Sequence, residues 1–242
     1  MNMVNWMKEH KKAIGIIVVI LCTAGLMASI YTAEFSVKAS RKDTIADAIR
    51  EQNFTPQTKV EVMAQKETED YLVVLYKQAD FEDCGGVALL EKGWFGNYRL
   101  YKSNTFMTPL YGAAAMSVAD ENYFFTYSMT NLPNVDTYRV YKDVREINEL
   151  IYEGKALEAP FVEMIKTEES YVPFVGTIRY YDKDGQEIYQ DELADSVNVA
   201  DTAAGGNFST ADRGAAYFFM VIVFLIGEAA IYMLVRKTKK EA

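Results

Sequence analysis

Residues 13–33 read AIGIIVVILCTAGLMASIYTA and contain no charged side chain. Residues 215–235 read AAYFFMVIVFLIGEAAIYMLV and contain one, Glu228. At about 1.5 Å per residue, a helix of either length spans about 30 Å, the thickness of the hydrocarbon core of a bilayer. The sequence therefore predicts two transmembrane helices at the ends of the chain, with a single domain between them.

The first apolar stretch has two interpretations. Lys8, Lys11 and Lys12 precede it, and a basic start before an apolar run also fits a cleaved signal peptide with its cleavage site after Ala24. The apolar run continues beyond Ala24. This favours an uncleaved signal anchor.

Basic residues flank both stretches on the side that faces a chain terminus. Because cytoplasmic flanks of membrane spans are enriched in Lys and Arg, we expect a two-pass protein of the cell membrane with both termini in the cytoplasm. The middle domain would then be extracytoplasmic. Three basic residues just past the first stretch oppose this rule, although long loops count for less in it: Lys38, Arg41 and Lys42.

The segment 34–213 is acidic. It holds 18 Lys and Arg residues against 31 Asp and Glu residues, a net charge of −13, whereas the whole chain has −9. This balance argues against nucleic acid as a partner and against docking on anionic lipid by charge attraction. We expect the lipid bilayer as the environment of the spans, and a membrane protein or a component of the cell envelope as the partner.

From residue 58 the pattern becomes that of β-strands. KVEVMAQ (59–65) alternates, YLVVLYKQ (71–78) is β-branched and aromatic, and tight turns are expected at Gly93–Asn97 and at Asp184-Gly185. The stretch 144–157 is ambiguous, because part of it fits a helical face, but a strand is favoured. The fold class is a mainly β domain, an antiparallel sheet or sandwich with a minor helical part, flanked by two transmembrane α-helices.

The expected order of segments follows from these patterns. Ser40 or Asp43 caps a short helix in which Ile45 and Ile49 share one face. The small and polar residues near 200 are typical of a flexible linker. The segments are a cytoplasmic tail (1–12), the first span (13–33), the short helix (34–52), the β domain (53–193), the linker (194–214), the second span (215–235) and a basic cytoplasmic tail (236–242).

Histidine is nearly absent, and the only one is His10. The middle domain therefore cannot contain a Ser-His-Asp triad, a Cys-His pair or a His-bound zinc ion. Pairs of carboxylates could still serve a hydrolase, but in an acidic domain such clusters are usually solvated charges. We expect no catalytic residue, metal or cofactor. The carboxylates considered are Glu67, Glu69, Asp70, Asp80, Glu82, Asp83, Glu168 and Glu169.

Two other motifs have a structural and a functional interpretation. DKDGQE (182–187) resembles the start of a calcium loop, but its flanking strands favour a plain hairpin turn. Cys84 is a buried thiol, a reactive thiol or an intermolecular link, and burial is favoured.

Three aromatic residues surround the turn at 93–97: Trp94, Phe95 and Tyr98. If exposed, their rings could stack on a sugar or a peptide. If buried, they belong to the core, which is the favoured interpretation.

Glu228 lies seven residues before Val235, about 10 Å inside the second span. A charge near a helix centre costs roughly 3 kcal/mol on insertion, which the apolar residues of the span offset. We expect Gly227 and Glu228 to pack on a small-residue face of the first span that includes Gly25, with Thr23 as a hydrogen-bond partner. The alternatives are a polar group of a partner protein, or a protonated acid that faces lipid.

The function predicted from these features is a membrane-anchored, non-enzymatic binding or accessory domain. One alternative is a carboxylate-dependent hydrolase that acts on envelope material. A second is a ligand sensor coupled through the two spans, which the flexible linker disfavours.

Overall fold

The computed structural model describes residues 10–107, 111–118, 121–144, 147–167, 176–188, 209–210 and 215–240. The chain divides into two compact units. One consists of residues 1–36 and 212–242 and contains the two terminal helices. The other consists of residues 37–211 and contains the β-sheets.

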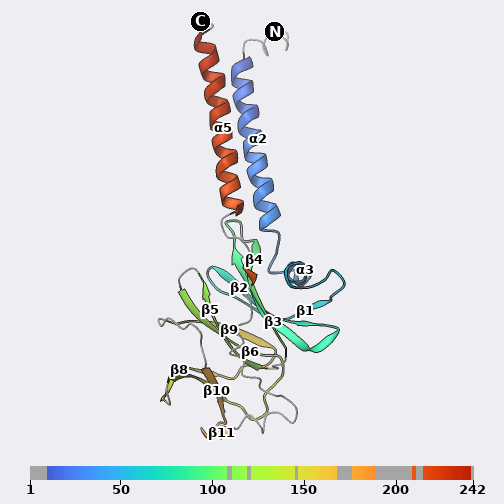
Figure 1. Cartoon of the computed structure of the whole chain (residues 1–242), viewed down its shortest axis with the longest axis vertical. Helices are drawn as coiled ribbons and strands as arrows, with labels where there is room; N and C mark the ends of the chain where they lie inside the picture. Colours follow the sequence, from blue (N-terminus) through green and yellow to red (C-terminus); the bar gives the residue numbers. More distant parts are fainter. Residues whose placement is uncertain are drawn as a thin grey trace. The chain divides into compact units, whose positions relative to one another are not determined.

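The two terminal helices are α2 (Lys11–Glu34) and α5 (Ala215–Lys240). They run side by side in opposite directions, so the start of α2 lies beside the end of α5 (Figure 1). At the other end of the pair, Tyr31 and Phe35 form an apolar cluster with Met220. Both helices are long and apolar enough to cross a membrane, over Ala13–Glu34 and Ala215–Arg236. The predicted pair of long apolar terminal helices is confirmed.

The described strands between the helices form three antiparallel sheets. The first has the order β1-β2-β3-β4-β12, the second β5-β6-β9 and the third β11-β10-β7-β8. This confirms a middle region rich in antiparallel sheets. The strands are β1 (Val60–Glu67), β2 (Tyr71–Gln78), β3 (Phe81–Lys92), β4 (Tyr98–Met107), β5 (Tyr111–Val118), β6 (Glu121–Ser128), β7 (Thr137–Val144), β8 (Ile147–Lys155), β9 (Phe161–Thr167), β10 (Gly176–Tyr181), β11 (Glu187–Ile188) and β12 (Ser209–Thr210).

Strand β2 lies inside the domain and is covered on both faces. Since alternate side chains of a strand point to opposite faces, its residues contribute to two different cores. Tyr71, Val73 and Leu75 pack toward the second sheet. Leu72, Val74 and Tyr76 pack toward helix α3 (Lys42–Asn53). Burial on both faces explains why β2 is continuously apolar from Tyr71 to Tyr76 and does not alternate.

The central strand of the second sheet, β6, has the same double role. Phe125 and Tyr127 face the first sheet, whereas Phe124 packs with Tyr138 and Val140 of the third sheet. The domain is therefore a stack of α3 and three sheets, in which the second sheet separates the first from the third.

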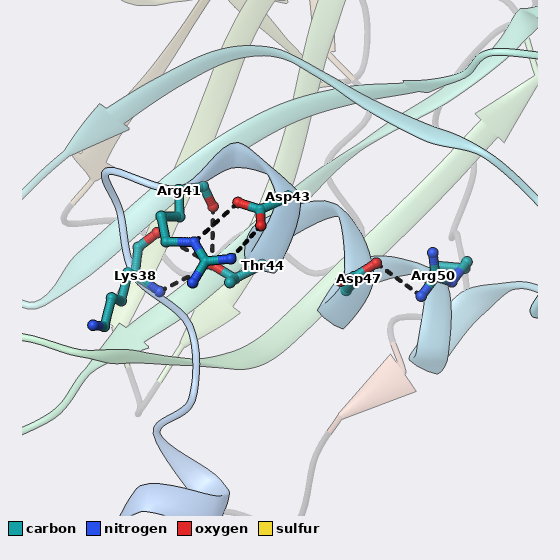
Figure 2. Close-up of polar contacts among 6 residues, drawn as sticks. All are labelled: Lys38, Arg41, Asp43, Thr44, Asp47 and Arg50. Carbon is teal, nitrogen blue, oxygen red and sulfur yellow. Dashed lines mark hydrogen bonds and ion pairs between the residues drawn. The ribbon is translucent and has the colours of Figure 1, made fainter.

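Helix α3 begins differently from the prediction. Ile45 and Ile49 are fully buried on the first sheet, as their spacing indicates. The N-cap residue is Arg41, and neither Ser40 nor Asp43 caps the helix. Asp43 instead lies in the first turn, where its carboxylate binds the guanidinium of Arg41 (Figure 2).

The two expected turns are present. In the β3–β4 turn the Gly93 N–H donates to the Asn97 carbonyl, and Gly96 has a φ of 76°. In the β10–β11 turn Gly185 has a φ of 75°. Glycine adopts such values without a steric penalty. The ambiguous stretch 144–157 contains strand β8, so the favoured strand is confirmed and the helical interpretation is wrong.

Most of the expected linker 194–214 lies outside the described residues. Its described part, β12, is not free, because Ser209 pairs with Ser103 and Thr210 with Lys102 of β4. Residues 209–210 therefore belong to the edge of the first sheet, since backbone hydrogen bonds to β4 fix them there.

Candidate functional site

Helices α2 and α5 approach each other closely at Gly227. A Cβ atom at this position would overlap the Oγ1 atom of Thr23 and would lie 3.0 Å from its Cγ2 atom. Gly227 is buried in the helix pair. The absence of a side chain therefore lets the two backbones come together beside Thr23, as small residues do between membrane helices.

Glu228 follows Gly227 but is exposed on the outer surface of α5. Successive residues of an α-helix are separated by about 100° around its axis, so Glu228 does not share the direction of Gly227. Gly25 of α2 is also away from the contact, because a Cβ atom there would meet no atom within 4 Å. The structure thus brings Thr23 to Gly227, and leaves Gly25 and the carboxylate of Glu228 on outer surfaces of the pair.

The neighbours of Glu228 on that surface are apolar. Leu225 and Tyr232, which lie three residues before and four residues after Glu228, are exposed large hydrophobic residues of α5. A carboxyl group in such a surface is costly in hydrocarbon unless another polar group binds it. In a membrane-spanning α5, Glu228 would therefore require a polar contact from outside the helix pair.

The second candidate is the turn between β3 and β4. The side chains of Trp94 and Phe95 are 71% and 79% exposed. Tyr98 is only 1% exposed, so it does not belong to an exposed aromatic surface as considered from the sequence. Its ring lies in the core between the first sheet and α3, because Tyr98 begins β4 with its side chain on that face.

A polar network holds Tyr98 at the base of this turn. The Tyr98 hydroxyl donates to Glu67 Oε1 at 2.6 Å, and Lys92 Nζ donates to the same oxygen at 2.7 Å. These contacts lower the pKa of Glu67, with the Lys92 hydrogen bond as the main cause. Burial, and then the carboxylate of Glu67, raise the pKa of Tyr98. The two residues that flank the turn, Lys92 and Tyr98, are therefore both held by Glu67.

From the sequence, Glu67 is considered as a candidate catalytic carboxylate or as a solvated charge, and not as a structural partner of Lys92 and Tyr98. Its partners lie 25 and 31 residues further along the chain. No local pattern marks such a contact, and only the pairing of β3 with β4, together with the position of β1 beside β2, brings these residues together.

Of the carboxylates considered for catalysis, Glu67 does not have the environment of a general acid. A general acid needs a raised pKa, whereas that of Glu67 is lowered. Within the same described part of the chain, no three His, Cys, Asp or Glu side chains are grouped as metal ligands. The side chains of Glu82, Asp83, Glu168 and Glu169 lie outside the described residues.

Cys84 is half-buried in β3. The Gln78 side-chain amide donates to its Sγ atom at 3.0 Å. Burial raises the pKa of the Cys84 thiol. A reactive cysteine needs the opposite shift, so this environment favours a structural thiol.

The DKDGQE segment uses its first carboxylate within its own turn. Asp182 Oδ1 accepts hydrogen bonds from the backbone N–H groups of Asp184 and Gln186, at 2.9 and 2.8 Å. This is the geometry of an Asx turn. A cavity of about 580 Å³ lies beside it, with Asp136, Asp182 and Lys183 among its lining residues.

Comparison with known proteins does not supply an identity: no family model, no curated protein and no solved structure matches this chain.

Proposed function

We propose that this chain is a two-pass protein of the cell membrane that acts as a non-enzymatic binding or accessory subunit of a membrane-protein partner. In this proposal both termini are cytoplasmic and residues 37–211 are extracytoplasmic. The helix pair anchors the subunit, and the β domain is presented on the outside.

The observation that carries this proposal is the position of Glu228. Gly227 contacts Thr23, whereas Glu228 is exposed on α5 among apolar side chains. Ionisable groups at membrane depth face other protein or a water-filled cavity in most membrane proteins. A polar group from the transmembrane helix of a partner would satisfy the carboxyl group of Glu228.

The properties of the β domain support a binding role over a chemical one. The only histidine of the chain is His10, which precedes the first span. The lowered pKa of Glu67 and the raised pKa of Cys84 oppose the roles of general acid and of nucleophile. These features support a domain that contributes a surface.

Site-specific photocrosslinking in native membranes tests the proposal. Photoreactive amino acids at Leu225 and Tyr232, which lie one turn before and after Glu228 and are exposed, should each form one discrete covalent adduct with another membrane protein. Glu228→Leu should abolish the adducts, and Glu228→Gln should retain them in part because an amide still forms hydrogen bonds.

Ile17 provides the matched control, because it is an exposed apolar residue on the other helix of the pair. A photoreactive group at Ile17 should not form the same adduct. Adducts that survive Glu228→Leu unchanged, or that form equally at Ile17, would exclude Glu228 as the contact to a partner.

A further inference from the structure

The β3–β4 turn presents two large aromatic side chains from a rigid base. Trp94 and Phe95 are the most exposed of the large hydrophobic side chains among the described residues. Hydrogen bonds from Gly93 to Asn97 and from Gly96 to Gly93 close the turn. Because large apolar rings gain free energy when another surface covers them, two such rings held outward favour contact with an apolar environment.

The covalent chain limits how far this turn can lie from the end of the first span. Val37 forms an antiparallel bridge with Tyr98, in which each N–H donates to the other carbonyl at 3.0 and 2.8 Å. Val37 is only three residues after Glu34, the last residue of α2. Each residue of an extended chain spans at most about 3.6 Å, and paired strands lie about 5 Å apart. The Tyr98 backbone therefore lies within about 15 Å of the end of α2.

A second connection ties the same strand to the second span. Thr210 pairs with Lys102 of β4, and Ala215, the first residue of α5, follows five residues later. Strand β4 is therefore connected through few residues to the outer ends of both spans. Trp94 and Phe95 lie three to four residues before Tyr98, which keeps them within about 30 Å of the end of α2, whatever orientation the domain adopts.

We propose that Trp94 and Phe95 insert into the interfacial region of the bilayer on the outer side and thereby dock the β domain on the lipid surface. This inference rests on the membrane anchoring in the proposed function and adds a lipid contact to it. Tryptophan favours the interface of membrane and water, because its ring is apolar and its N–H donates to polar groups there.

Lipid is a better match to this surface than a charged ligand. The segment 34–213 has a net charge of −13, which opposes simple attraction to anionic headgroups. The docking is therefore driven by the two rings. At its base Lys92 is already paired with Glu67, and the exposed Lys38, next to Val37, adds a positive charge near the headgroups.

The fluorescence of Trp94 tests the proposal in the full chain. The chain has two tryptophans, so Trp6→Phe makes Trp94 the only one. The protein is reconstituted in phosphatidylcholine nanodiscs with and without bromine on the acyl chains near the headgroup. The expected result is a blue-shifted Trp94 emission and a loss of intensity in brominated lipid.

Two control variants, each without Trp6 and Trp94, calibrate the result. Phe224→Trp reports on an exposed position of α5 and should be quenched by brominated lipid if the helix is in the membrane. Lys183→Trp reports on the exposed β10–β11 turn and should not be quenched. Trp94 should lose a fraction of its emission comparable with that of the Phe224→Trp variant.

Each of the other outcomes contradicts either the lipid docking or the membrane anchoring. If the Phe224→Trp variant is quenched and Trp94 emits as a tryptophan in water, the anchoring stands and the lipid docking is wrong. If Trp94 is blue-shifted but not quenched, its contact is with protein, either a partner or a second copy, and the lipid docking is also wrong. If the Phe224→Trp variant is not quenched, the membrane anchoring itself fails.

Discussion

Glu67 shows how a single carboxylate joins separate strands of the first sheet. It ends β1, and its Oε1 atom accepts hydrogen bonds from Lys92 at the end of β3 and from Tyr98 at the start of β4. Both donors favour the ionised form of the acid. The pKa of Glu67 is therefore lowered from its ordinary value of 4.5.

This shift predicts a dependence of stability on pH. Because the pKa is lower in the folded state, Glu67 stabilises the fold above about pH 4.5, and this contribution is lost as the pH falls through the folded pKa. Glu67→Gln should lower the free energy of unfolding at pH 7 by less than about 1 kcal/mol, since the pair is partly solvated. It should also make the decline between pH 5 and 3 shallower.

Urea unfolding of the full chain in detergent, followed by circular dichroism at several pH values, measures this effect. Lys92→Met removes the main cause of the shift and should flatten the same pH range. An unchanged slope in both variants would show that the contacts of Glu67 do not contribute to acid sensitivity.

At the scale of elements, Gly227 allows α2 and α5 to pack closely beside Thr23. Any side chain at Gly227 would overlap Thr23. Gly25, the other glycine considered at the sequence level, has no neighbour within 4 Å of a built Cβ atom. Gly227→Leu should therefore separate the helices, and Gly25→Leu should not.

Oxidative crosslinking between the helices measures this separation. A Cβ atom at Gly15 would lie 3.7 Å from the side chain of Leu234, so cysteines at these two positions, in a chain without Cys22 and Cys84, should form a disulfide. The crosslink should be retained with Gly25→Leu and largely lost with Gly227→Leu. Equal crosslinking in both variants would contradict the close approach at Gly227.

How far the sequence predicts these elements depends on how local their signals are. The two long apolar stretches and the turn at Gly185 have local signals in the sequence, and the structure contains the corresponding helices and turn. The exposure of Glu228 cannot be predicted from the local sequence, because it depends on which face of α5 contacts Thr23. Neighbouring residues of a helix differ in direction by about 100°, so Gly227 and Glu228 cannot both face α2.

The aromatic turn shows the same limit. Trp94, Phe95 and Tyr98 are all aromatic, so residue type alone does not predict which of them is buried. In the structure only Tyr98 belongs to the core. Their separation depends on the register of β3 against β4, in which Lys92 pairs with Tyr98 and leaves the residues between them in the turn.

At the scale of the whole molecule, the antiparallel helix pair restricts the topology. Since the start of α2 lies beside the end of α5 (Figure 1), the two chain tails must lie on the same side of any membrane that both helices cross. In the proposed topology this side is the cytoplasm, because basic residues precede the first apolar helix and follow the second. The same proposal puts the β domain on the opposite side, since residues 37–211 connect the other ends of the helices in the chain.

Labelling of single cysteines in intact cells tests this topology. In a chain without Cys22 and Cys84, Lys183→Cys in the exposed β10–β11 turn should react with a membrane-impermeant maleimide. Lys8→Cys and Lys239→Cys should react only after the membrane is permeabilised. The two tail positions must behave alike, because the helices are paired in opposite directions. The inverse pattern would place the β domain in the cytoplasm, and a difference between the tails would contradict the helix pair itself.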